Sequence, residues 1–385
     1  MVPAARCAAT LREPMDRRFD FEVDEDIRRA STLPAWIYSD SAVFARARER
    51  VFARSWQLVG DTDRLRSPGQ VLPFALLEGC LDEPLLLTRD RDDRLHCLSN
   101  VCTHRGNLVV ESPGIEAQLR CRYHGRRFAL DGRFHSMPEF EDTAGFPSPA
   151  DDLPRVPFDT WEKFVFASLD PPGPLDALLR DVRERCGWLP LGQATLDPAR
   201  SRDYLVGANW ALYCDNYLEG FHIPYVHAGL AGALDYGSYT TELYPWSCLQ
   251  LGVASDAEAA FEPPASSTDH GRRIAAYYWW LYPNTMLNFY PWGVSVNVVK
   301  PLGVDRTRVS YLSYVWDPTR LERGAGAALD RVEREDEAVV ESVQQGLRSR
   351  LYSRGRYSPA REQGVHHFHR LLAERLGRVP APSGV

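Results

Sequence analysis

Long apolar runs are missing from this 385-residue sequence. A transmembrane helix needs roughly 18 consecutive apolar residues, and no stretch of the chain provides them. The first thirty residues, MVPAARCAATLREPMDRRFDFEVDEDIRRA, also lack the apolar core of a secretory signal peptide. We therefore expect a cytoplasmic protein with no membrane partner.

Cysteine is scarce as well, and the 45 basic residues are outnumbered by 52 acidic ones. Eight cysteines are dilute for this length, and their spacing does not resemble a disulfide framework, which favours a reducing compartment. A cysteine with a function here is a metal ligand or a buried thiol. The net charge of −7 argues against nucleic acid as the main partner, because such a partner requires a basic surface.

The pattern of apolar residues changes several times along the chain. Residues 41–58 have apolar side chains at helical spacing, and short alternating runs such as VLPFALLE and LHCLSNV follow, separated by Gly, Pro and Asp. After DPPGPLD (Asp170 to Asp176) come a helical region, aromatic β-prone runs and a long helical pattern over 326–351. This order predicts an α+β protein with two domains.

The predicted division has three parts. Residues 1–54 form an N-terminal helical segment that packs on the second domain. Residues 55–165 form a small antiparallel β domain, and residues 166–385 form the second domain.

Two short motifs in the β domain each combine a thiol with an imidazole. CTHRG contains Cys102 and His104, and CRYHG, which begins after 16 intervening residues, contains Cys121 and His124. Two cysteines on one iron and two histidines on the other are the ligands of a Rieske [2Fe–2S] cluster. Two Cys and two His also suit a structural zinc ion, although zinc sites usually take two cysteines from one short turn. Both readings stay open on spacing alone, with the cluster favoured.

A third motif, YLEGFHIPYVH, places His222 and His227 five residues apart. Histidines at this spacing would lie about 140° apart on one continuous helix and could not reach one metal. Pro224 between them predicts that the helix ends near His222 and that the chain turns to bring His227 back. Glu219 precedes His222 by three residues, on roughly the same helical face.

Two imidazoles and a carboxylate form the facial triad of mononuclear Fe(II) oxygenases, so a carboxylate is missing. In LDRVEREDEAVVESVQQGL, residues 329–347, helical periodicity places Asp336 in the middle of an apolar stripe. A carboxylate on an apolar face is costly unless it is paired or binds a metal. Asp336 is therefore the predicted third ligand, with Glu333 as the alternative.

Together these motifs resemble the Rieske non-haem iron oxygenases, from about Ile37 to Leu376. NWALYCDNYLEGFHIPYVH is similar to the catalytic motif of this family, and the stretch from Arg334 to Leu371 resembles the branch of choline monooxygenase and betaine demethylases. The family often has Trp after YHG, where this sequence has Arg126. That difference affects packing beneath the cluster loop more than ligation.

The resemblance implies a Rieske [2Fe–2S] β domain followed by a helix-grip (START/Bet v1-like) catalytic domain whose antiparallel sheet wraps a long C-terminal helix. It implies that Asp336 binds iron and that Glu219 bridges His222 to His124 of a neighbouring subunit. It also implies a homotrimer that receives NAD(P)H electrons from a flavin and iron–sulfur reductase, with or without a ferredoxin. O₂ is then the co-substrate of the Fe(II) site.

The substrate is less well defined by the sequence. YYWWLYPNTMLNFYPW, residues 277–292, is rich in aromatic side chains, most of which we expect in the sheet core. Aromatic faces also bind quaternary ammonium groups. The predicted pocket residues are Tyr278, Trp280, Phe289 and Trp292. A further cluster, VHHFHR with His366, His367 and His369, is interpreted as packing rather than as a metal site.

The sequence thus predicts a terminal oxygenase that hydroxylates, and so in some cases N-demethylates, a small organic substrate such as a methylated or quaternary amine. A ring-hydroxylating dioxygenase is the alternative within the family. From other classes, a Rieske ferredoxin-type electron carrier and a zinc-stabilised binding protein remain.

Overall fold

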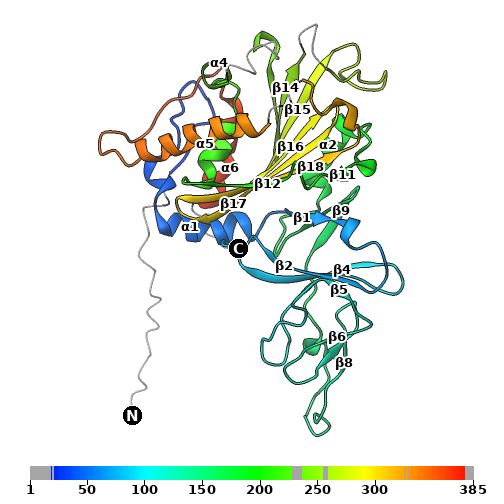
Figure 1. Cartoon of the computed structure of the whole chain (residues 1–385). Coiled ribbons are helices and arrows are strands. Elements are labelled where there is room, and N and C mark those ends of the chain that lie inside the picture. Colours follow the sequence, from blue (N-terminus) through cyan, green and yellow to red (C-terminus); the bar gives the residue numbers. More distant parts are fainter. Residues whose placement is uncertain are drawn as a thin grey trace, which may run out of the picture.

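The computed structural model describes residues 19, 21–227, 236–254, 259–324, 326–327 and 329–377. A small β-rich part lies at one end of the molecule, and a larger part with one extensive sheet lies at the other (Figure 1). The α+β architecture predicted from the sequence is confirmed, with the cluster motifs in the first part and the histidine motif in the second.

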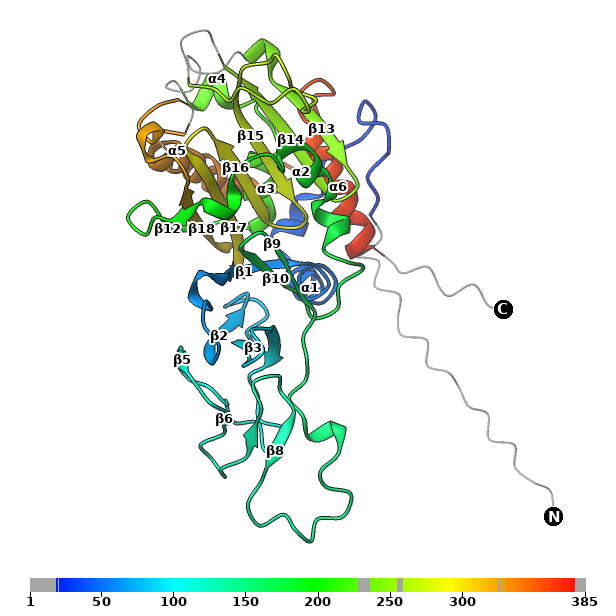
Figure 2. The same cartoon turned by 90° about the vertical axis from the view of Figure 1, so that its right-hand side faces the viewer.

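The β-rich part contains three small antiparallel sheets. Their orders are β4-β3-β2-β5, β6-β7-β8 and β1-β10-β9. The strands are β1 (Gln57–Asp61), β2 (Gln70–Leu76), β3 (Glu83–Arg89), β4 (Leu95–Ser99), β5 (Gly114–Ile115), β6 (Leu119–Arg120), β7 (Arg127–Phe128), β8 (Phe134–Ser136), β9 (Phe158–Trp161) and β10 (Phe164–Ala167). The two cluster motifs lie in the loops that follow β4 and β6, at the end of the molecule farthest from the large sheet (Figures 1 and 2).

The segment before β1 is helical and packs on the larger part. Asp40 caps α1 (Ser41–Ala47), which continues as a wider π-helical turn over Arg48–Phe52. The predicted helix over residues 41–58 therefore ends early. Gln57 and the residues after it pair instead with β10, so backbone hydrogen bonding in a sheet replaces the last helical turn.

The larger part is built on one antiparallel sheet with the order β11-β18-β17-β16-β15-β14-β13, and β12 also pairs with β18. The strands are β11 (Thr195–Leu196), β12 (Arg202–Val206), β13 (Thr240–Tyr244), β14 (Ser247–Val253), β15 (Ile274–Leu281), β16 (Thr285–Tyr290), β17 (Gly293–Gly303) and β18 (Arg306–Val315). Both faces of its centre are buried: every residue of β16 is buried.

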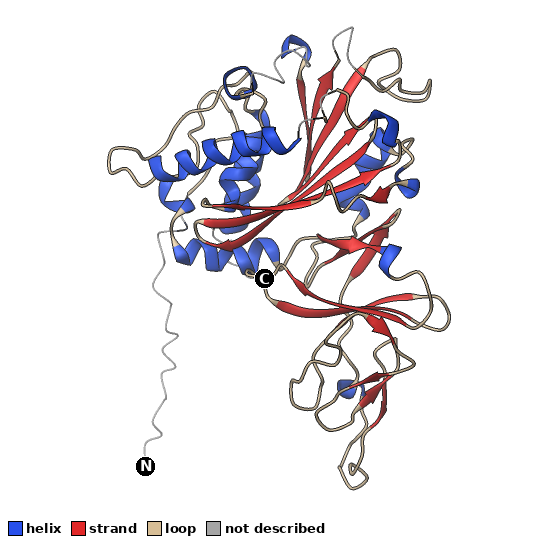
Figure 3. Cartoon of the chain, in the orientation of Figure 1, coloured by secondary structure: helices blue, strands red, loops and turns tan. Residues whose placement is uncertain are grey.

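Helices cover both faces of this sheet (Figure 3). The helices are α2 (Asp176–Cys186), α3 (Trp210–Tyr217), α4 (Ile223–Val226), α5 (Leu329–Gly346) and α6 (Gln363–Leu376). α2 packs on the face that carries Tyr277 and Trp279, whereas α3 and α6 pack on the face that carries Trp280. Three helices, α3, α5 and α6, thus share the face expected to hold one long helix (Figure 2). No helix in the described part of the chain is both long and apolar enough to span a bilayer.

Candidate active site

The histidine motif forms two short helices rather than one broken helix. The Asn209 side chain caps α3 by accepting a hydrogen bond from Ala211 N, and α3 ends at Tyr217, before Glu219. His222 directly precedes the one-turn helix α4 without a side-chain capping hydrogen bond, and His227 directly follows it. Pro224 lies in the first turn of this helix instead of ending the previous one, because proline's fixed φ suits a first helical turn. The prediction that the helix continues to His222 was therefore wrong.

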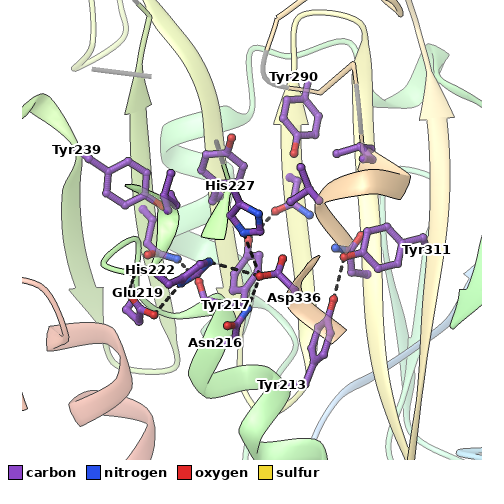
Figure 4. A pocket seen from close by; sticks show the side chains of 17 residues that line it. Tyr213, Asn216, Tyr217, Glu219, His222, His227, Tyr239, Tyr290, Tyr311 and Asp336 are labelled. Atoms are coloured by element: carbon purple, nitrogen blue, oxygen red, sulfur yellow. Dashed lines mark hydrogen bonds and ion pairs between the residues drawn. The ribbon is translucent and has the colours of Figure 1, made fainter. Parts of the chain in front are cut away.

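The turn between α3 and α4 brings the two imidazoles together with a carboxylate of α5 (Figure 4). Oδ1 of Asp336 lies 3.0 Å from Nε2 of His227 and 3.4 Å from Nε2 of His222. Potential ligand atoms of these three residues all lie within 4.8 Å of one another, the only such group of three among the described residues. Two nitrogens and one oxygen converging on one point suit a facial triad with open positions.

Each member of this triad is held by a further polar side chain. Nδ1 of His222 is 2.7 Å from Oε1 of Glu219, and Nδ1 of His227 is 2.8 Å from Oε2 of Glu335. Carboxylates behind the histidines fix the ring orientation and leave Nε2 free to bind a metal. The sequence identified Glu219 but not Glu335, because Glu335 lies at the side of the predicted apolar stripe.

Asp336 is also oriented from α3. Asn216 donates from Nδ2 to Oδ1 of Asp336 at 2.8 Å. The sequence analysis missed Asn216, although its place six residues before His222 puts it on the helix that leads into the motif.

The charges of the cluster favour a cation at this point. Burial lowers the pKa of His222, but hydrogen bonds to Asp336 and Glu219 outweigh burial and raise it to about 9. Burial raises the pKa of Asp336, but hydrogen bonds from both histidines hold it below its usual value. A divalent metal ion matches this arrangement, because it satisfies one carboxylate and two imidazole nitrogens at once.

α5 presents a more polar inner face than its sequence pattern suggested. Glu333, Val340 and Gln344 are buried, whereas the apolar Val343 is 43% exposed. One oxygen of each buried polar side chain has a partner: Oε1 of Gln344 accepts a hydrogen bond from Asn209 N at 2.8 Å. The helix also begins at Leu329 and ends at Gly346, inside the predicted range of 326–351.

Glu333, the alternative ligand, has other partners. Its Oε2 accepts hydrogen bonds from the hydroxyls of Tyr213, at 2.6 Å, and Tyr311. Burial is the main cause that raises its pKa to about 8. Glu333 therefore lies behind the cavity wall as a hydrogen-bonded acid, outside the converging group.

A cavity opens beside the triad, between the sheet and the helices (Figure 4). Most of its other lining residues carry aromatic, hydroxyl or amide groups. They are Tyr213, Asn216, Tyr217, Glu219, Ile223, Tyr239, Gln250, Tyr278, Asn288, Tyr290, Asn297, Tyr311, Leu329 and Val332. Tyr278 packs against Tyr290 with ring centroids 5.9 Å apart and against Tyr239 at 6.5 Å, so three tyrosines form one wall.

Of the four predicted pocket aromatics, only Tyr278 lines this cavity. Phe289 points to the opposite face of the sheet, because it pairs with Tyr277, whose side chain packs against α2. Trp280 lies on the same face as Tyr278, but Phe368 of α6 fills the space beside it, with ring centroids 5.2 Å apart. Trp292 lies behind Tyr290, stacked on it at 5.4 Å. The structure thus corrects the prediction that Trp280, Phe289 and Trp292 line the pocket. Tyr239 and Tyr290 form the aromatic wall with Tyr278, and Tyr217 also lines the cavity.

The two cluster motifs face each other at the tip of the β-rich part. The thiols of Cys102 and Cys121 are buried, while His104 and His124 are partly exposed with ring centroids 4.8 Å apart. Two inner thiols and two outer imidazoles match the division of ligands in a two-iron cluster, in which one iron takes the cysteines and the other takes the histidines.

Tight backbone turns shape both cluster loops. Gly106 and Gly125 have φ values of +73° and +75°, which favour glycine, and their amides bond back to the carbonyls of Cys102 and Cys121. A side chain added at Gly106 would meet no atom within 4 Å. The positive φ, and not steric crowding, therefore favours glycine at Gly106.

The histidines of α6 serve packing, as predicted. Nε2 of His369 is 2.8 Å from Oδ1 of Asp215, and its Nδ1 is 2.6 Å from the hydroxyl of Tyr357. His366 contacts the backbone oxygen of Asp24 at 2.8 Å. These contacts attach α6 to α3 and to the N-terminal segment.

Known proteins share both parts of this structure. Residues 55–147 match the family model of the Rieske [2Fe-2S] domain, and residues 188–378 match that of the ring hydroxylating alpha subunit (catalytic domain). The sequence is 31% identical over 379 residues to a chloroplastic choline monooxygenase of Arabidopsis thaliana, covering 93% of this chain and 86% of the relative. It is 30% identical over 377 residues to the carnitine monooxygenase oxygenase subunit of Escherichia coli K12, covering 92% and 97%.

Solved structures agree. A quaternary ammonium Rieske monooxygenase superposes with a TM-score of 0.75 at 25% identity, covering 91% of this chain and 96% of the other. Naphthalene 1,2-dioxygenase from a Rhodococcus species shares the fold, with a TM-score of 0.69 at 17% identity and coverage of 89% and 93%. The chain belongs to the Rieske non-haem iron oxygenases, as an α subunit that joins a Rieske domain to a ring-hydroxylase-type catalytic domain.

Proposed function

We propose that this protein is the terminal oxygenase component of a system that hydroxylates a quaternary or methylated amine. The observation that carries the substrate assignment is the cavity beside the triad. Among the described residues that line it, none is Lys or Arg, and the wall formed by Tyr239, Tyr278 and Tyr290 presents aromatic rings. Aromatic faces attract cations by roughly 0.5 to 2 kcal/mol each.

Two groups of relatives are named for choline and for carnitine, and carnitine carries a carboxylate that choline lacks. A cavity whose described lining has no Lys or Arg favours an amine whose remaining part is uncharged, because a buried carboxylate needs a partner.

In this proposal the triad of His222, His227 and Asp336 holds Fe(II), and Cys102, His104, Cys121 and His124 hold the Rieske cluster. Fe(II) in a facial triad supplies O₂ activation. The protein positions the reaction: the tyrosine wall orients the substrate beside the triad, and Glu219 and Glu335 keep both imidazoles turned toward the metal. Hydroxylation of an N-methyl carbon would give a carbinolamine, whose C–N bond then breaks to release formaldehyde and the demethylated amine.

The proposed route of electrons runs between subunits. The cluster loops and α4 lie at opposite ends of the molecule (Figures 1 and 2). This separation supports electron transfer from a cluster to the triad of a neighbouring copy, in a homotrimer. Glu219 is the proposed bridge, because one of its oxygens holds Nδ1 of His222. A flavin and iron–sulfur reductase would supply electrons from NAD(P)H. We assign residues 55–165 to the cluster domain and the residues after 165 to the catalytic domain.

The alternative within the family is a dioxygenase acting on an aromatic ring, since the same tyrosine wall can stack on an arene. An electron carrier is disfavoured, because it would leave the converging triad without a role.

Iron and sulfide quantification, followed by O₂ uptake with a surrogate reductase, tests the proposal. We expect three iron atoms and two sulfides per chain, from one cluster and one mononuclear site, and substrate-dependent O₂ uptake with choline-like amines. Uptake coupled to a neutral arene but not to any amine would favour the dioxygenase. Two iron atoms per chain and no turnover would favour the electron carrier.

A further inference from the structure

A buried positive charge lies beneath the cluster loops. The side chain of Arg126 is 2% exposed and forms an ion pair with Asp151, with Nη2 and Oδ1 2.5 Å apart. Asp151 itself is 20% exposed and lies at the edge of the domain, where water reaches it. The guanidinium is therefore the more deeply buried partner of this pair.

Arg126 is connected to both loops that carry the cluster motifs. Its backbone oxygen accepts a hydrogen bond from Cys121 N at 2.9 Å. The backbone oxygen of Asp151 accepts one from the hydroxyl of Thr103, the residue between Cys102 and His104, at 2.8 Å. The ion pair thus sits where the two loops meet.

The surroundings of the guanidinium are apolar. Rings of Phe128, Phe134 and Phe146 lie 5.1 to 5.7 Å from its central carbon. Its Nε is buried and has no hydrogen-bond partner among the described residues. A charge in such an environment acts over a longer range than one in water, because the effective dielectric constant is lower.

We propose that Arg126 sets the reduction potential of the Rieske cluster, holding it higher than a neutral side chain at the same position would. Reduction adds one electron to the cluster, and a fixed cation in an apolar setting stabilises that added negative charge. Reduction potentials of iron–sulfur clusters respond to local charge, hydrogen bonds and solvent exposure in this way. The inference rests on the proposed cluster. In it, Arg126 acts through the cluster and makes electron uptake from the reductase more favourable.

The test is a redox titration of the purified holoprotein, followed by the EPR signal of the reduced cluster. In Arg126→Gln we expect the ratio of reduced to oxidised cluster at a fixed potential to fall about tenfold, a shift of about 59 mV for a one-electron couple. In Asp151→Asn the charge of Arg126 loses its counter-ion, so the midpoint should rise. Arg126→Lys keeps the charge and should stay near the wild-type midpoint.

Arg122 provides a matched control. It directly follows Cys121, but its side chain is 79% exposed and pairs with Glu111 at the surface. Arg122→Gln should change the midpoint little, and less still at high ionic strength, because salt screens exposed charges. The shift in Arg126→Gln should persist at high salt.

Opposite shifts in Arg126→Gln and Asp151→Asn, with unchanged g-values, would support the inference. An unchanged midpoint in Arg126→Gln with an intact cluster would overturn it, as would an equal shift in Arg122→Gln. If Arg126→Gln fails to retain its cluster, an unchanged or lower midpoint in Asp151→Asn overturns it instead. A wild-type protein without iron and sulfide would contradict the proposed function rather than this inference.

Discussion

Asn216 and Asp336 are joined by a hydrogen bond of 2.8 Å that ends on Oδ1, the carboxylate oxygen closest to both histidines of the triad. This bond ties α5 to α3, the helix that leads into the histidine motif. It also occupies one lone pair of that oxygen and so limits the directions from which a metal can be bound.

Removing this bond should weaken iron binding. We expect Asn216→Ala to lower the affinity for Fe(II) by about 10- to 100-fold, the usual effect of losing a side chain that orients a ligand. A chelator competition assay on the mononuclear site measures the change. Asn288→Ala, another amide of the cavity wall but without a hydrogen bond to Asp336, is the matched control. Equal affinity in Asn216→Ala and wild type would contradict the role assigned to Asn216.

Asp336 itself should be indispensable for the mononuclear site and irrelevant to the cluster. Asp336→Ala leaves two imidazoles and removes the only carboxylate of the converging group, so bound iron should fall from three to two atoms per chain. The visible and EPR spectra of the cluster should not change. The neighbouring Glu337→Gln variant should keep three iron atoms per chain. Turnover by Asp336→Ala with full iron content would show that another residue completes the site.

Glu219 should control electron transfer rather than metal content. In Glu219→Gln we expect both iron centres to be loaded, while oxidation of the reduced cluster in the presence of substrate and O₂ slows by at least about tenfold. The reason is that an amide holds Nδ1 of His222 less strongly than a carboxylate does. Stopped-flow absorbance of the cluster measures this rate. Rapid oxidation in this variant would place the route elsewhere.

The tyrosine wall should recognise positive charge. Tyr278→Leu should weaken binding of choline by about 2- to 30-fold, the equivalent of roughly 0.5 to 2 kcal/mol. Binding of its neutral tert-butyl isostere, 3,3-dimethyl-1-butanol, should change much less. Tyr278→Phe retains the ring and should resemble wild type. Calorimetric titration with both ligands is the measurement, and equal losses for the two would indicate a purely steric role.

Glu333 should make stability depend on pH. Its pKa is raised to about 8 in the folded protein, mainly by burial, from an ordinary value near 4.5. The folded state therefore holds a proton that the unfolded state releases between these values, so stability falls as the pH rises from about 5 to 8. The loss is on the order of a few kcal/mol.

Glu333→Gln removes this titration while it retains an oxygen that accepts hydrogen bonds from Tyr213 and Tyr311. As the pH rises, the melting temperature of this variant should increase relative to that of wild type. Thermal unfolding across this pH range, with Glu341→Gln as the partly exposed comparison, measures the shift. A constant difference would mean that Glu333 is ionised throughout.

The proposed ligands could be selected from the sequence because ligand chemistry constrains local spacing. Cys102 and His104 lie in one tight loop, and a carboxylate such as Asp336 is costly on an apolar helical face without a cation nearby. Both arguments need only short segments. The family resemblance supplied what they could not, namely the role proposed for Glu219.

The cavity wall could not be predicted in the same way. Strand alternation places the side chains of Tyr277 and Tyr278 on opposite faces of the sheet. It cannot show that Phe368 of α6 fills the space next to Trp280. The position of Tyr290 depends on the register of β16 against β15, and register is decided by the whole sheet. Likewise, Pro224 has two common uses near helices, and only the assembled turn shows that it begins α4.

The packing around α3 has a consequence for how the protein is made. Trp210, at the start of α3, packs against Phe52 from the N-terminal segment at 4.8 Å and against Phe368 from α6 at 5.7 Å. The helix that positions the triad is thus clamped by segments separated by some three hundred residues, whereas all four cluster ligands lie within 23 consecutive residues. During synthesis the cluster domain emerges complete long before the triad can assemble. We therefore expect the four proposed cluster ligands to come together before the triad, which needs α6 to dock on α3.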